Sequence, residues 1–526
     1  MAELPDMVRG LMQPQAYPEP TKRVRLEQTQ MSFVFLTDDF AYKVKKPVNL
    51  GYLDYSTIEK RLFFCNRELE LNRRLCENPY LEVVNITQQQ KAFSINGDGE
   101  TVDYAVKMRR LPTNLFMDNL LEDEGVSEEM IIRLAQKIAA FHGQAATSSE
   151  INAFGSIENI NRNNDENFSQ TEDYIGRTIS SRQYRQIMDY NRSFIRENSS
   201  LFEKRIQGGK IRDCHGDLHT AHICFENGIC IYDCIEFNDR FRYGDTASEV
   251  AFLAMDLDHH GRADLSHSFI EKYIDSSGDK ELKKLLTFYK CYRAYVRGKV
   301  ACFKLDDPYI TAEERDKTLQ DAIDYFNLAY AYVKLPKTLF ITAGLVGSGK
   351  SSIAQSLASR LGLTYISSDI TRKQLAGIWI KERRLEKTNT GIYSPEFSRK
   401  TYDTMFSRAK TILEEGGSAI IDASFIKASE REKAKELAER SDARFYILEC
   451  KLEEGLTRQR LLQRQQQDSI SDGRWEIYQV QKGIFEEISD SPLLNRVIID
   501  NYNPVNDNVR QVIDTIYEGA DYDSTE

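Results

Sequence analysis

Residues 344–351 read Gly-Leu-Val-Gly-Ser-Gly-Lys-Ser and fit the phosphate-loop pattern G-x-x-x-x-G-K-[ST] at every fixed position. The apolar, β-branched run 338–343 before it predicts a buried strand, and 352–361 after it is apolar at helical spacing. Strand, glycine loop and helix form an anion cradle, because loop N–H groups and the helix N-terminus point to one place. The pattern predicts a site for ATP and Mg²⁺, in which Lys350 reaches the β/γ-phosphates and Ser351 holds the metal. The candidate nucleotide-binding residues are Gly344, Gly347, Ser348, Gly349, Lys350, Ser351 and Ser352.

A second phosphoryl-transfer pattern lies upstream, in His-Gly-Asp-Leu-His-Thr-Ala-His at 215–222. It matches the kinase catalytic-loop pattern H-R-D-L-x-x-x-N, except that Gly216 replaces Arg and His222 replaces Asn. An apolar strand at 229–232 follows and ends at Asp233. In this pattern the loop Asp accepts the proton of the acceptor hydroxyl, and the Asp after the next hairpin holds Mg²⁺ on the phosphates.

These residues resemble the aminoglycoside phosphotransferase and choline kinase-like families, which are small-molecule relatives of the protein kinases. The resemblance covers residues 30–330. Asp245 follows Asp233 by 12 residues, in agreement with a second Asp that ties down the next helix in those families. The whole chain is similar to bacterial bifunctional aminoglycoside phosphotransferase/ATP-binding proteins, with landmarks at 41–47, 108–111, 233–237 and 251–256.

The resemblance implies a role for each matching residue. Asp217 would be the catalytic base and Asp233 a Mg²⁺ ligand. A strand lysine would pair with the α/β-phosphates. Lys43 and Lys45 share one strand face, because strand side chains alternate with period two, so the choice stays open, and we favour Lys43. Glu68 is the expected ion-pair partner of that lysine.

His222 departs from the family, which usually has Asn at this position. Asn offers a hard oxygen ligand that suits Mg²⁺, whereas a neutral imidazole is a poorer ligand for that ion. Three interpretations follow: a site with one well-held metal, a site that favours Mn²⁺, or a pseudokinase that binds nucleotide and transfers phosphate slowly. We favour activity and keep His222 among the candidate metal ligands. The nearby histidines also allow a zinc site, but the pattern favours a catalytic loop, and His142 is predicted to be a core histidine.

After the P-loop the sequence resembles small P-loop kinases of the polynucleotide kinase, zeta-toxin and adenylate kinase-like kind. The resemblance implies that Asp369 contacts the acceptor hydroxyl as base and that Arg372 binds the acceptor. The apolar strand 418–421 ends at Asp422, the Walker-B arrangement that supports Mg²⁺. Asp369 has an alternative role as a helix N-cap.

Three arginines downstream, Arg458, Arg460 and Arg464, precede a Gln-rich stretch at 465–468. They look like a lid whose arginines neutralise charge on the transferring phosphoryl group, and Arg460 and Arg464 are the catalytic candidates. A solvated helix face is the alternative interpretation.

The elements that must position the first site are a hairpin, a helix and a meander. Segments 32–36 and 40–45 predict the hairpin. The helix is expected over 56–76, with Ser56 as N-cap and Glu59 completing a capping box. The meander comprises 81–86, 92–95 and 102–108, after which 108–111 would form the hinge behind the adenine.

Further along, 111–333 is expected to be mostly helical with a β-rich interruption near 211–237. The aromatic stripe over 280–334, which includes Tyr292, is predicted to be core. Around the P-loop, strand-like runs at 418–421, 444–450 and 497–499 alternate with helices, which indicates a doubly wound parallel sheet.

The predicted fold class is therefore multidomain α+β and α/β: a bilobal protein-kinase-like domain followed by a doubly wound P-loop NTPase domain. The expected boundaries are 1–110 for the kinase-like N-lobe, 111–333 for its helical C-lobe, 336–520 for the P-loop kinase and 521–526 for a disordered tail.

Composition narrows the function classes. A chain of 526 residues is too long for one ordinary core, and its net charge of −11 argues against nucleic acid as a general partner. No apolar run approaches the ~18–20 residues that span a bilayer, and the N-terminus has no signal segment. The nine cysteines contain no C-x-x-C pair, so we expect buried, reduced thiols and a cytoplasmic protein.

The sequence thus predicts a bifunctional ATP-dependent kinase that phosphorylates hydroxyls of small-molecule acceptors at two sites. One alternative is a nucleotide-regulated binding protein with a weak or inactive kinase-like domain. Another is a P-loop kinase acting on nucleotide or nucleic-acid hydroxyls. The acidic composition weakly favours a cationic acceptor. The acceptors, the oligomeric state and any coupling between the sites stay open.

Overall fold

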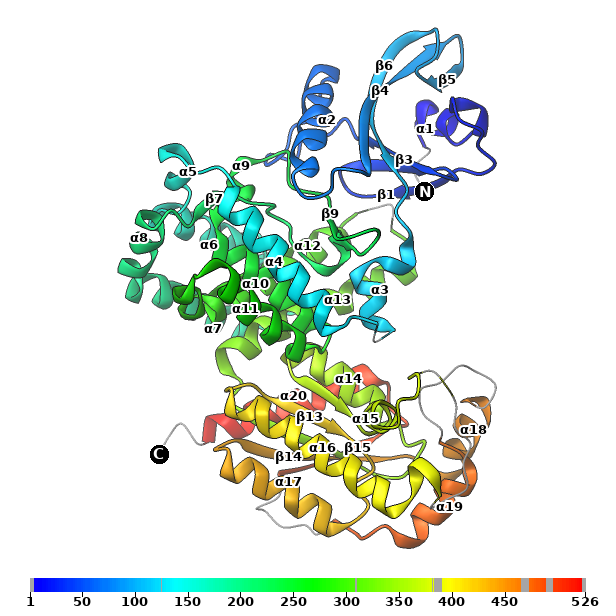
Figure 1. Cartoon of the computed structure of the whole chain (residues 1–526), viewed down its shortest axis with the longest axis vertical. Coiled ribbons are helices and arrows are strands. Elements are labelled where there is room, and N and C mark those ends of the chain that lie inside the picture. The colour runs from blue at the N-terminus through cyan, green and yellow to red at the C-terminus, as the bar shows by residue number, and fades with distance from the viewer. Residues whose placement is uncertain are drawn as a thin grey trace. The chain divides into compact units, whose positions relative to one another are not determined.

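The computed structural model describes residues 4–123, 125–307, 310–380, 382, 390–464, 473–488 and 495–522. The chain divides into two compact units (Figure 1). The first comprises Met1–Asp256 with Ser268–Phe326, and the second comprises Leu257–His267 with Asn327–Glu526. In the part of the chain so described, no helix has the length and apolar character needed to cross a membrane.

An antiparallel sheet of six strands opens the first unit, in the order β1-β2-β3-β6-β4-β5. The strands are β1 (Arg25–Gln28), β2 (Ser32–Leu36), β3 (Phe40–Lys45), β4 (Tyr80–Gln89), β5 (Ala92–Ile95) and β6 (Glu100–Arg109). The predicted hairpin and meander are confirmed. Alternate side chains such as Phe35, Tyr42 and Val84 form a core on one side of the sheet. Helix α2 (Ile58–Arg73) packs against β4 and β6 (Figure 1).

The start of α2 differs from the prediction. Thr57, not Ser56, is the N-cap, and its hydroxyl accepts a hydrogen bond from the Lys60 N–H at 3.3 Å. The Ser56 hydroxyl donates instead to Asp54 Oδ1 at 2.6 Å. The predicted capping box is therefore wrong, because a neighbouring carboxylate engages the serine that the pattern singled out.

The rest of the first unit is mostly helical, as predicted. Its helices, which lie wholly or mostly in this unit, are α1 (Asp6–Leu11), α3 (Met117–Glu122), α4 (Glu128–Gln144), α5 (Ser149–Ala153), α6 (Ile157–Ser169), α7 (Ser181–Glu197), α8 (Ser199–Gln207), α9 (Asp239–Arg242), α10 (Thr246–His259), α11 (Ala263–Ser277), α12 (Leu286–Leu305) and α13 (Ala312–Lys334). The predicted β-rich interruption consists of two small ribbons. One pairs β7 (Ile211–Asp213) with β10 (Tyr243–Asp245), and the other pairs β8 (Ile223–Cys224) with β9 (Cys230–Ile231).

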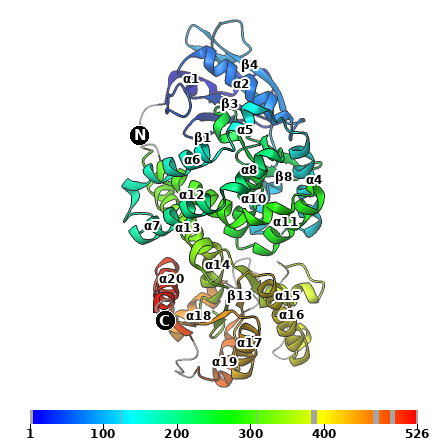
Figure 2. The ribbon, with the colours of Figure 1, turned by 90° about the vertical axis from the view of Figure 1, so that its left-hand side faces the viewer.

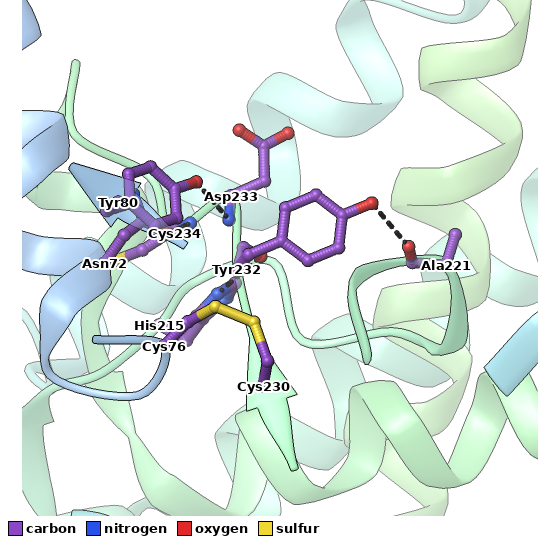
Figure 3. The surroundings of a disulfide bond; sticks show 9 residues. All are labelled: Asn72, Cys76, Tyr80, His215, Ala221, Cys230, Tyr232, Asp233 and Cys234. Carbon is purple, nitrogen blue, oxygen red and sulfur yellow. Dashed lines mark hydrogen bonds between the residues drawn. A yellow bond between two sulfur atoms is a disulfide. The ribbon is translucent and has the colours of Figure 1, made fainter. Parts of the chain in front are cut away.

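Cys76 and Cys230 form a disulfide that joins the segment after α2 to β9 (Figure 3). Their Cα atoms lie 4.5 Å apart although 154 residues separate them in sequence. The other seven cysteines are free and buried. The expectation of reduced thiols is therefore confirmed for those seven and wrong for this pair, which only the tertiary fold brings together.

The second unit contains a five-stranded parallel sheet in the order β12-β13-β11-β14-β15. The strands are β11 (Thr338–Ala343), β12 (Thr364–Ser367), β13 (Ala419–Asp422), β14 (Arg444–Lys451) and β15 (Asn495–Asp500). The central strand β11 is buried at every position, as its apolar, β-branched run predicted.

Helices cover both faces of this sheet, with α16 and α17 on one face and α14 and α20 on the other (Figure 1). The helices are α14 (Lys350–Leu361), α15 (Ser368–Leu375), α16 (Pro395–Glu414), α17 (Ala428–Arg440), α18 (Glu454–Arg464), α19 (Trp475–Ile484) and α20 (Val505–Tyr522). The predicted fold class is confirmed. Helix α20 extends two residues into the stretch 521–526 that was expected to be a tail, and 523–526 lie outside the described residues.

Candidate active sites

The phosphate loop connects β11 to α14, and its three glycines all have a left-handed backbone. Their φ angles are +135° at Gly344, +83° at Gly347 and +89° at Gly349, a region that favours glycine. A Cβ on Gly344 would lie 2.4 Å from the Cys450 carbonyl oxygen, and one on Gly349 would lie 2.9 Å from Asn501 Nδ2. The loop can therefore follow this path, close against its neighbours, only with glycine at these positions.

The side chains of this loop fit a bound nucleotide phosphate. The Ser348 hydroxyl is buried and has no partner among the described residues. Lys350 Nζ folds over the loop and donates to the Leu345 carbonyl at 2.7 Å. Ser351 and Ser352 are exposed on the first turn of α14. A buried unpaired hydroxyl, a lysine over the loop and hydroxyls at a helix N-terminus are suited to phosphate oxygens and to Mg²⁺.

Asp422 ends β13, next to the phosphate-loop strand, and is almost fully buried. Its carboxylate accepts hydrogen bonds from Thr342 Oγ1 at 3.2 Å and from the Tyr365 hydroxyl at 2.7 Å. Burial and the Asp422 charge hold the pKa of Tyr365 well above its usual range, so the phenol stays a donor. The predicted Walker-B carboxylate is thus oriented by two partners from neighbouring strands that the sequence analysis did not identify.

Asp369 and Arg372 lie together on α15. Ser367 is the N-cap of this helix, accepting from the Ile370 N–H at 3.4 Å, so the alternative role of Asp369 as N-cap is wrong. Arg372 donates to Asp369 Oδ1 at 3.4 Å, and its guanidinium lies 4.8 Å from the centre of the Tyr393 ring. Because β12 is parallel to β11, both side chains follow the same carboxyl edge of the sheet as the phosphate loop.

Arg460 on α18 lies beside the phosphate loop. It donates to the Asn501 carbonyl at 3.0 Å, and its Nη1 would be 3.5 Å from a Cβ placed on Gly349. Asn501, which follows β15, donates through Nδ2 to the Ser348 carbonyl. The asparagine links the loop to the arginine, and no motif in the sequence indicated it.

The other two arginines of the expected lid have different places. Arg458 stacks on Trp475, with 5.4 Å between its guanidinium carbon and the ring centre. Arg464 is the last residue of α18, and its side chain and the Gln-rich stretch 465–468 lie outside the described residues. Roles of Arg464 and of the lid therefore stay predictions.

In the first unit the catalytic loop runs between β7 and β8, and Gly216 explains its departure from the kinase pattern. Gly216 has φ +87°, and a Cβ there would lie 2.9 Å from the Phe241 carbonyl oxygen. The N–H groups of Gly216 and His215 donate to the buried Glu249 carboxylate at 2.6 and 3.0 Å. His142, the predicted core histidine, hydrogen-bonds Glu249 at 2.8 Å. Glu249 thus anchors the catalytic loop, and the sequence analysis missed it.

The loop brings Asp217 together with His219 and His222. Both imidazoles lie 3.6 Å from Asp217 Oδ2, and His222 Nε2 also lies 3.6 Å from Asp233 Oδ2. Burial opposes the ionisation of Asp217, but His219, His222 and Arg297 hold its pKa well below its usual range. Asp217 is therefore ionised at neutral pH, as a general base must be.

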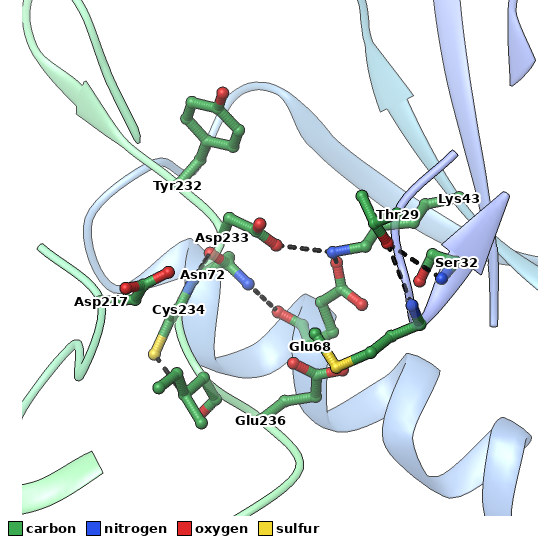
Figure 4. Close-up of polar contacts among 12 residues, drawn as sticks. Thr29, Ser32, Lys43, Glu68, Asn72, Asp217, Tyr232, Asp233, Cys234 and Glu236 are labelled. Atoms are coloured by element: carbon green, nitrogen blue, oxygen red, sulfur yellow. Dashed lines mark hydrogen bonds and ion pairs between the residues drawn. The ribbon is translucent and has the colours of Figure 1, made fainter. Parts of the chain in front are cut away.

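Asp233 follows β9 and reaches into the same space from a strained backbone with φ +62°. Lys43 bridges it to α2: Nζ lies 2.5 Å from Asp233 Oδ1 and 2.9 Å from Glu68 Oε1 (Figure 4). Burial disfavours the Lys43 cation, but Asp233 and Glu68 raise its pKa well above the usual value. The predicted lysine, its glutamate partner and the candidate metal ligand are thus in contact.

Lys45 occupies a different environment. It is almost fully buried, and Nζ contacts Glu68 Oε2 at 2.6 Å as well as the Glu236 carboxylate. A cavity of about 380 Å³ is lined by Lys43 together with Asp217 and Asp233, while Lys45 is not on its wall. The geometry therefore favours Lys43 as the lysine that meets a ligand and Lys45 as the centre of a buried ion-pair network.

Two other residues of this unit bear on the predictions. Asp245 accepts from the Ala247 N–H at 2.9 Å at the start of α10, which is consistent with the expected helix-tying role. Tyr292, predicted to be core, lines the cavity instead.

Methionine substitutions should separate the two lysines. Lys43→Met is expected to weaken ADP binding at the first unit at least about tenfold, because one charge-assisted contact to phosphate is lost. Lys45→Met should cost about 3–5 kcal/mol of unfolding free energy, because it leaves Glu68 and Glu236 short of a buried counter-charge. Urea unfolding and ADP titration, both in the Lys350→Ala background, measure the two effects. Equal loss of stability in both variants would contradict this division.

Comparisons with known proteins cover both units. The sequence family described as AAA domain matches residues 339–488. Rv2004c of Mycobacterium tuberculosis (strain ATCC 25618 / H37Rv), described as an uncharacterized protein, is 30% identical over 417 residues, which are 79% of this chain and 81% of that protein. MT2060 of M. tuberculosis (strain CDC 1551 / Oshkosh) and Mb2027c of Mycobacterium bovis match over the same length with the same identity.

Solved structures resemble parts of the chain. A gluconokinase from Sinorhizobium meliloti 1021 aligns with a TM-score of 0.27 and 20% identity, covering 36% of this chain and 96% of its own. The amicoumacin kinase hAmiN, in complex with AMP-PNP, Ca²⁺ and Ami, aligns with a TM-score of 0.37 and 11% identity, covering 60% of this chain and 89% of its own. Both scores are low, and neither likeness assigns a role to a residue here.

Proposed function

This chain belongs to the family of the mycobacterial proteins Rv2004c, MT2060 and Mb2027c, and we propose that it is a bifunctional ATP-dependent phosphotransferase. It transfers the γ-phosphate of ATP to hydroxyl groups of small-molecule acceptors at two separate sites. The chain is a phosphotransferase enzyme in its general class, since a complete phosphate loop stands in a unit whose sequence matches the AAA domain family. Beyond this general class, we propose that the chain has two transfer sites and that their acceptors are small molecules.

One observation carries the two-site proposal: each unit holds one lysine, one carboxylate suited to a metal and one carboxylate suited to a base. The two sets are Lys43, Asp233 and Asp217 in the first unit, and Lys350, Asp422 and Asp369 in the second. Phosphoryl transfer needs little more from the protein than positioning and charge neutralisation. Two such sets support two transfer sites.

In the second unit, the loop N–H groups and Lys350 would hold the β- and γ-phosphates, and Ser351 and Asp422 would hold Mg²⁺. The metal, when bound, supplies charge neutralisation on the phosphate oxygens. The oxygen of the acceptor hydroxyl would form a bond to the γ-phosphorus, while the bond from the γ-phosphorus to the bridging oxygen of the β-phosphate breaks. Asp369 would accept the proton of that hydroxyl. Arg460, beside the loop, would stabilise the negative charge that moves onto the leaving ADP.

In the first unit, Lys43 would pair with the α- and β-phosphates and Asp233 would hold Mg²⁺. Asp217, ionised at neutral pH, would accept the hydroxyl proton. Because Lys43 contacts the Asp233 carboxylate directly, its ammonium must share or leave that carboxylate when nucleotide and metal bind. Glu68 remains in place to hold the lysine during this exchange.

A second candidate function, nucleotide-regulated binding with little turnover, is favoured by His222 at the first site. Its imidazole faces Asp233 at 3.6 Å, at a position where the aminoglycoside phosphotransferase family, which this unit resembles, usually provides an asparagine oxygen. If the first site is a weakened kinase, His222→Asn should raise Mg²⁺-supported turnover several-fold and lower the ratio of Mn²⁺ to Mg²⁺ activity. The matched control is His267→Asn, which makes the same change at a half-buried histidine of the second unit, outside the cavity. An unchanged metal ratio would count against His222 as a metal ligand.

The two-site proposal is tested by ATP turnover in four chains: wild type, Lys350→Ala, Asp217→Asn and the double variant. Each is incubated with γ-labelled ATP, Mg²⁺ or Mn²⁺, and pooled metabolites, and label transfer to hydroxyl products is measured. Two product sets are expected, each lost in one single variant. A parallel assay with nucleosides and 5′-hydroxyl oligonucleotides covers the nucleic-acid alternative. Label transfer that survives in the double variant would contradict the proposal.

A further inference from the structure

Helix α12 contributes three cations to the lining of the cavity in the first unit. Arg293, Arg297 and Lys299 all line this cavity together with Asp217. Arg293 and Arg297 are four residues apart, so both lie on one side of the helix. Helix α6, which contributes to the same cavity, lies beside α12 (Figure 2).

None of these three cations has an ion-pair partner within 4 Å among the described residues. Arg293 donates to Ser248 Oγ at 3.0 Å and to the Gly216 carbonyl at 3.4 Å. Lys299 donates to the amide oxygens of Asn167 at 2.7 Å and Gln170 at 2.9 Å. All of these acceptors are neutral, so the charges of both side chains are available to a ligand.

Arg297 differs from the other two cations because one of its buried donors has no hydrogen-bond partner among the described residues. Its guanidinium stacks on the Tyr325 ring at 5.2 Å, and its Nε is buried without a hydrogen-bond partner among the described residues. It is also close enough to Asp217 to lower the pKa of that carboxyl group. Arg297 therefore combines an unmet donor with a place next to the candidate base.

Two other cations that line the cavity, both on α9, do have carboxylate partners. Arg240 is held by Glu166 through two hydrogen bonds of 2.8 and 2.7 Å. Arg242 donates to Asp213 at 2.6 Å and to Asp239 at 2.7 Å. Glu166, Asp213 and Asp239 are thus already engaged by other cations, and none of them is an ion-pair partner of the α12 cations.

We propose that the acceptor of the kinase-like site is an anion: a polyhydroxylated molecule whose carboxylate or phosphate binds Arg293, Arg297 and Lys299 while a hydroxyl lies at Asp217. This inference rests on the proposed function of that site. Guanidinium groups suit carboxylate and phosphate because they offer paired N–H donors in one plane. The weak expectation of a cationic acceptor, drawn from the net charge of the whole chain, gives way to the three cations that α12 contributes to the cavity lining.

The charge state of Lys299 would respond to an anion bound in this cavity. Burial lowers its pKa to about 8, and Glu166 offsets this only in part. Burying an ammonium without a counter-ion disfavours its charged form, and an anion bound beside it would restore that form.

The test compares four six-carbon probes that differ in one terminal group. D-gluconate has a carboxylate at C1, D-glucitol 6-phosphate has a phosphate at C6, D-glucitol is uncharged and D-glucamine has an ammonium at C1. Binding to the full chain carrying Lys350→Ala, in the presence of ADP and Mg²⁺, is measured by calorimetry. At least one anion should bind about tenfold or more tightly than glucitol and glucamine. The two anions distinguish a carboxylate from a phosphate as the preferred group. Tighter or equal binding of glucamine or glucitol, or no binding of any probe, would overturn the proposal.

Variants place the binding on α12. Arg293→Gln with Arg297→Gln should remove at least about tenfold of the anion affinity. Lys304→Gln, an exposed cation of the same helix outside the cavity, should change nothing. Anion affinity that survives the double variant, in a chain that still binds ADP, would overturn the assignment. Failure of ADP to bind the Lys350→Ala chain would instead count against the proposed function, so the two failures are distinguishable.

Discussion

Lys350→Ala is expected to lower ATP turnover at the P-loop unit by about 10²–10³-fold, or about 3–4 kcal/mol of transition-state stabilisation. The lysine lies over a loop whose glycines hold the main chain close to the phosphate site, and it brings the cation that meets the β/γ-phosphates. Because it contributes charge to both ground and transition states, nucleotide affinity should fall as well. Turnover is measured as ADP release in the Asp217→Asn background, because that variant removes the expected turnover of the first unit.

An exposed lysine provides the matched control for this prediction. Lys410 lies on α16, and its side chain is 60% exposed. Among the described residues its ion-pair partner is Glu414, one turn away. Lys410→Ala should leave turnover within error of the parent chain, since exposed i,i+4 pairs contribute little. Unchanged turnover in Lys350→Ala would remove the P-loop unit as the source of the activity measured.

Asp217→Asn should reduce turnover at the first unit by about 10²–10⁴-fold while leaving ADP affinity nearly unchanged. The amide keeps the shape of the side chain but cannot accept the hydroxyl proton. The loop that carries residue 217 is held by hydrogen bonds from the His215 and Gly216 N–H groups to Glu249, and the substitution leaves these bonds unchanged. Turnover and ADP binding are measured in the Lys350→Ala background.

Asp189→Asn on α7 is the control for this variant, because the same chemical change is made at an exposed site outside the cavity. A joint loss of turnover and ADP binding in Asp217→Asn would indicate structural damage. Retained turnover would mean that Asp217 is not the base and would favour the regulatory function for the first unit.

The local patterns were the most informative part of the sequence. The run at 344–351 predicted a strand, a loop and a helix, and all three are present with boundaries within two residues. Prediction succeeds here because the chemistry is local: the glycine conformations, the lysine and the hydroxyls all belong to one short segment. The pattern at 215–222 is equally local, and its role as a catalytic loop stays a prediction.

Contacts between distant segments were missed or left open. Asn501 and Glu249 hold the two loops in place, yet neither belongs to a motif, and each meets its partner only after folding. The Ser56 capping box failed because Asp54 engages the serine hydroxyl. The Cys76–Cys230 disulfide joins residues 154 apart, with no spacing that signals it.

The sequence by itself indicated phosphoryl-transfer chemistry, because glycines, a lysine and a hydroxyl stand at fixed short spacings in the P-loop, and histidines and a carboxylate do so in the pattern at 215–222. Only the tertiary structure separated Lys43 from Lys45, since both share a strand face and the difference lies in what packs around them. Likewise, Arg293 and Arg297 belong to a helix whose aromatic periodicity indicated core. Folding places them on the lining of a cavity, where neither has an ion-pair partner within 4 Å among the described residues. The charge that an acceptor meets depends on which ion pairs form across the fold, and net composition does not contain that information.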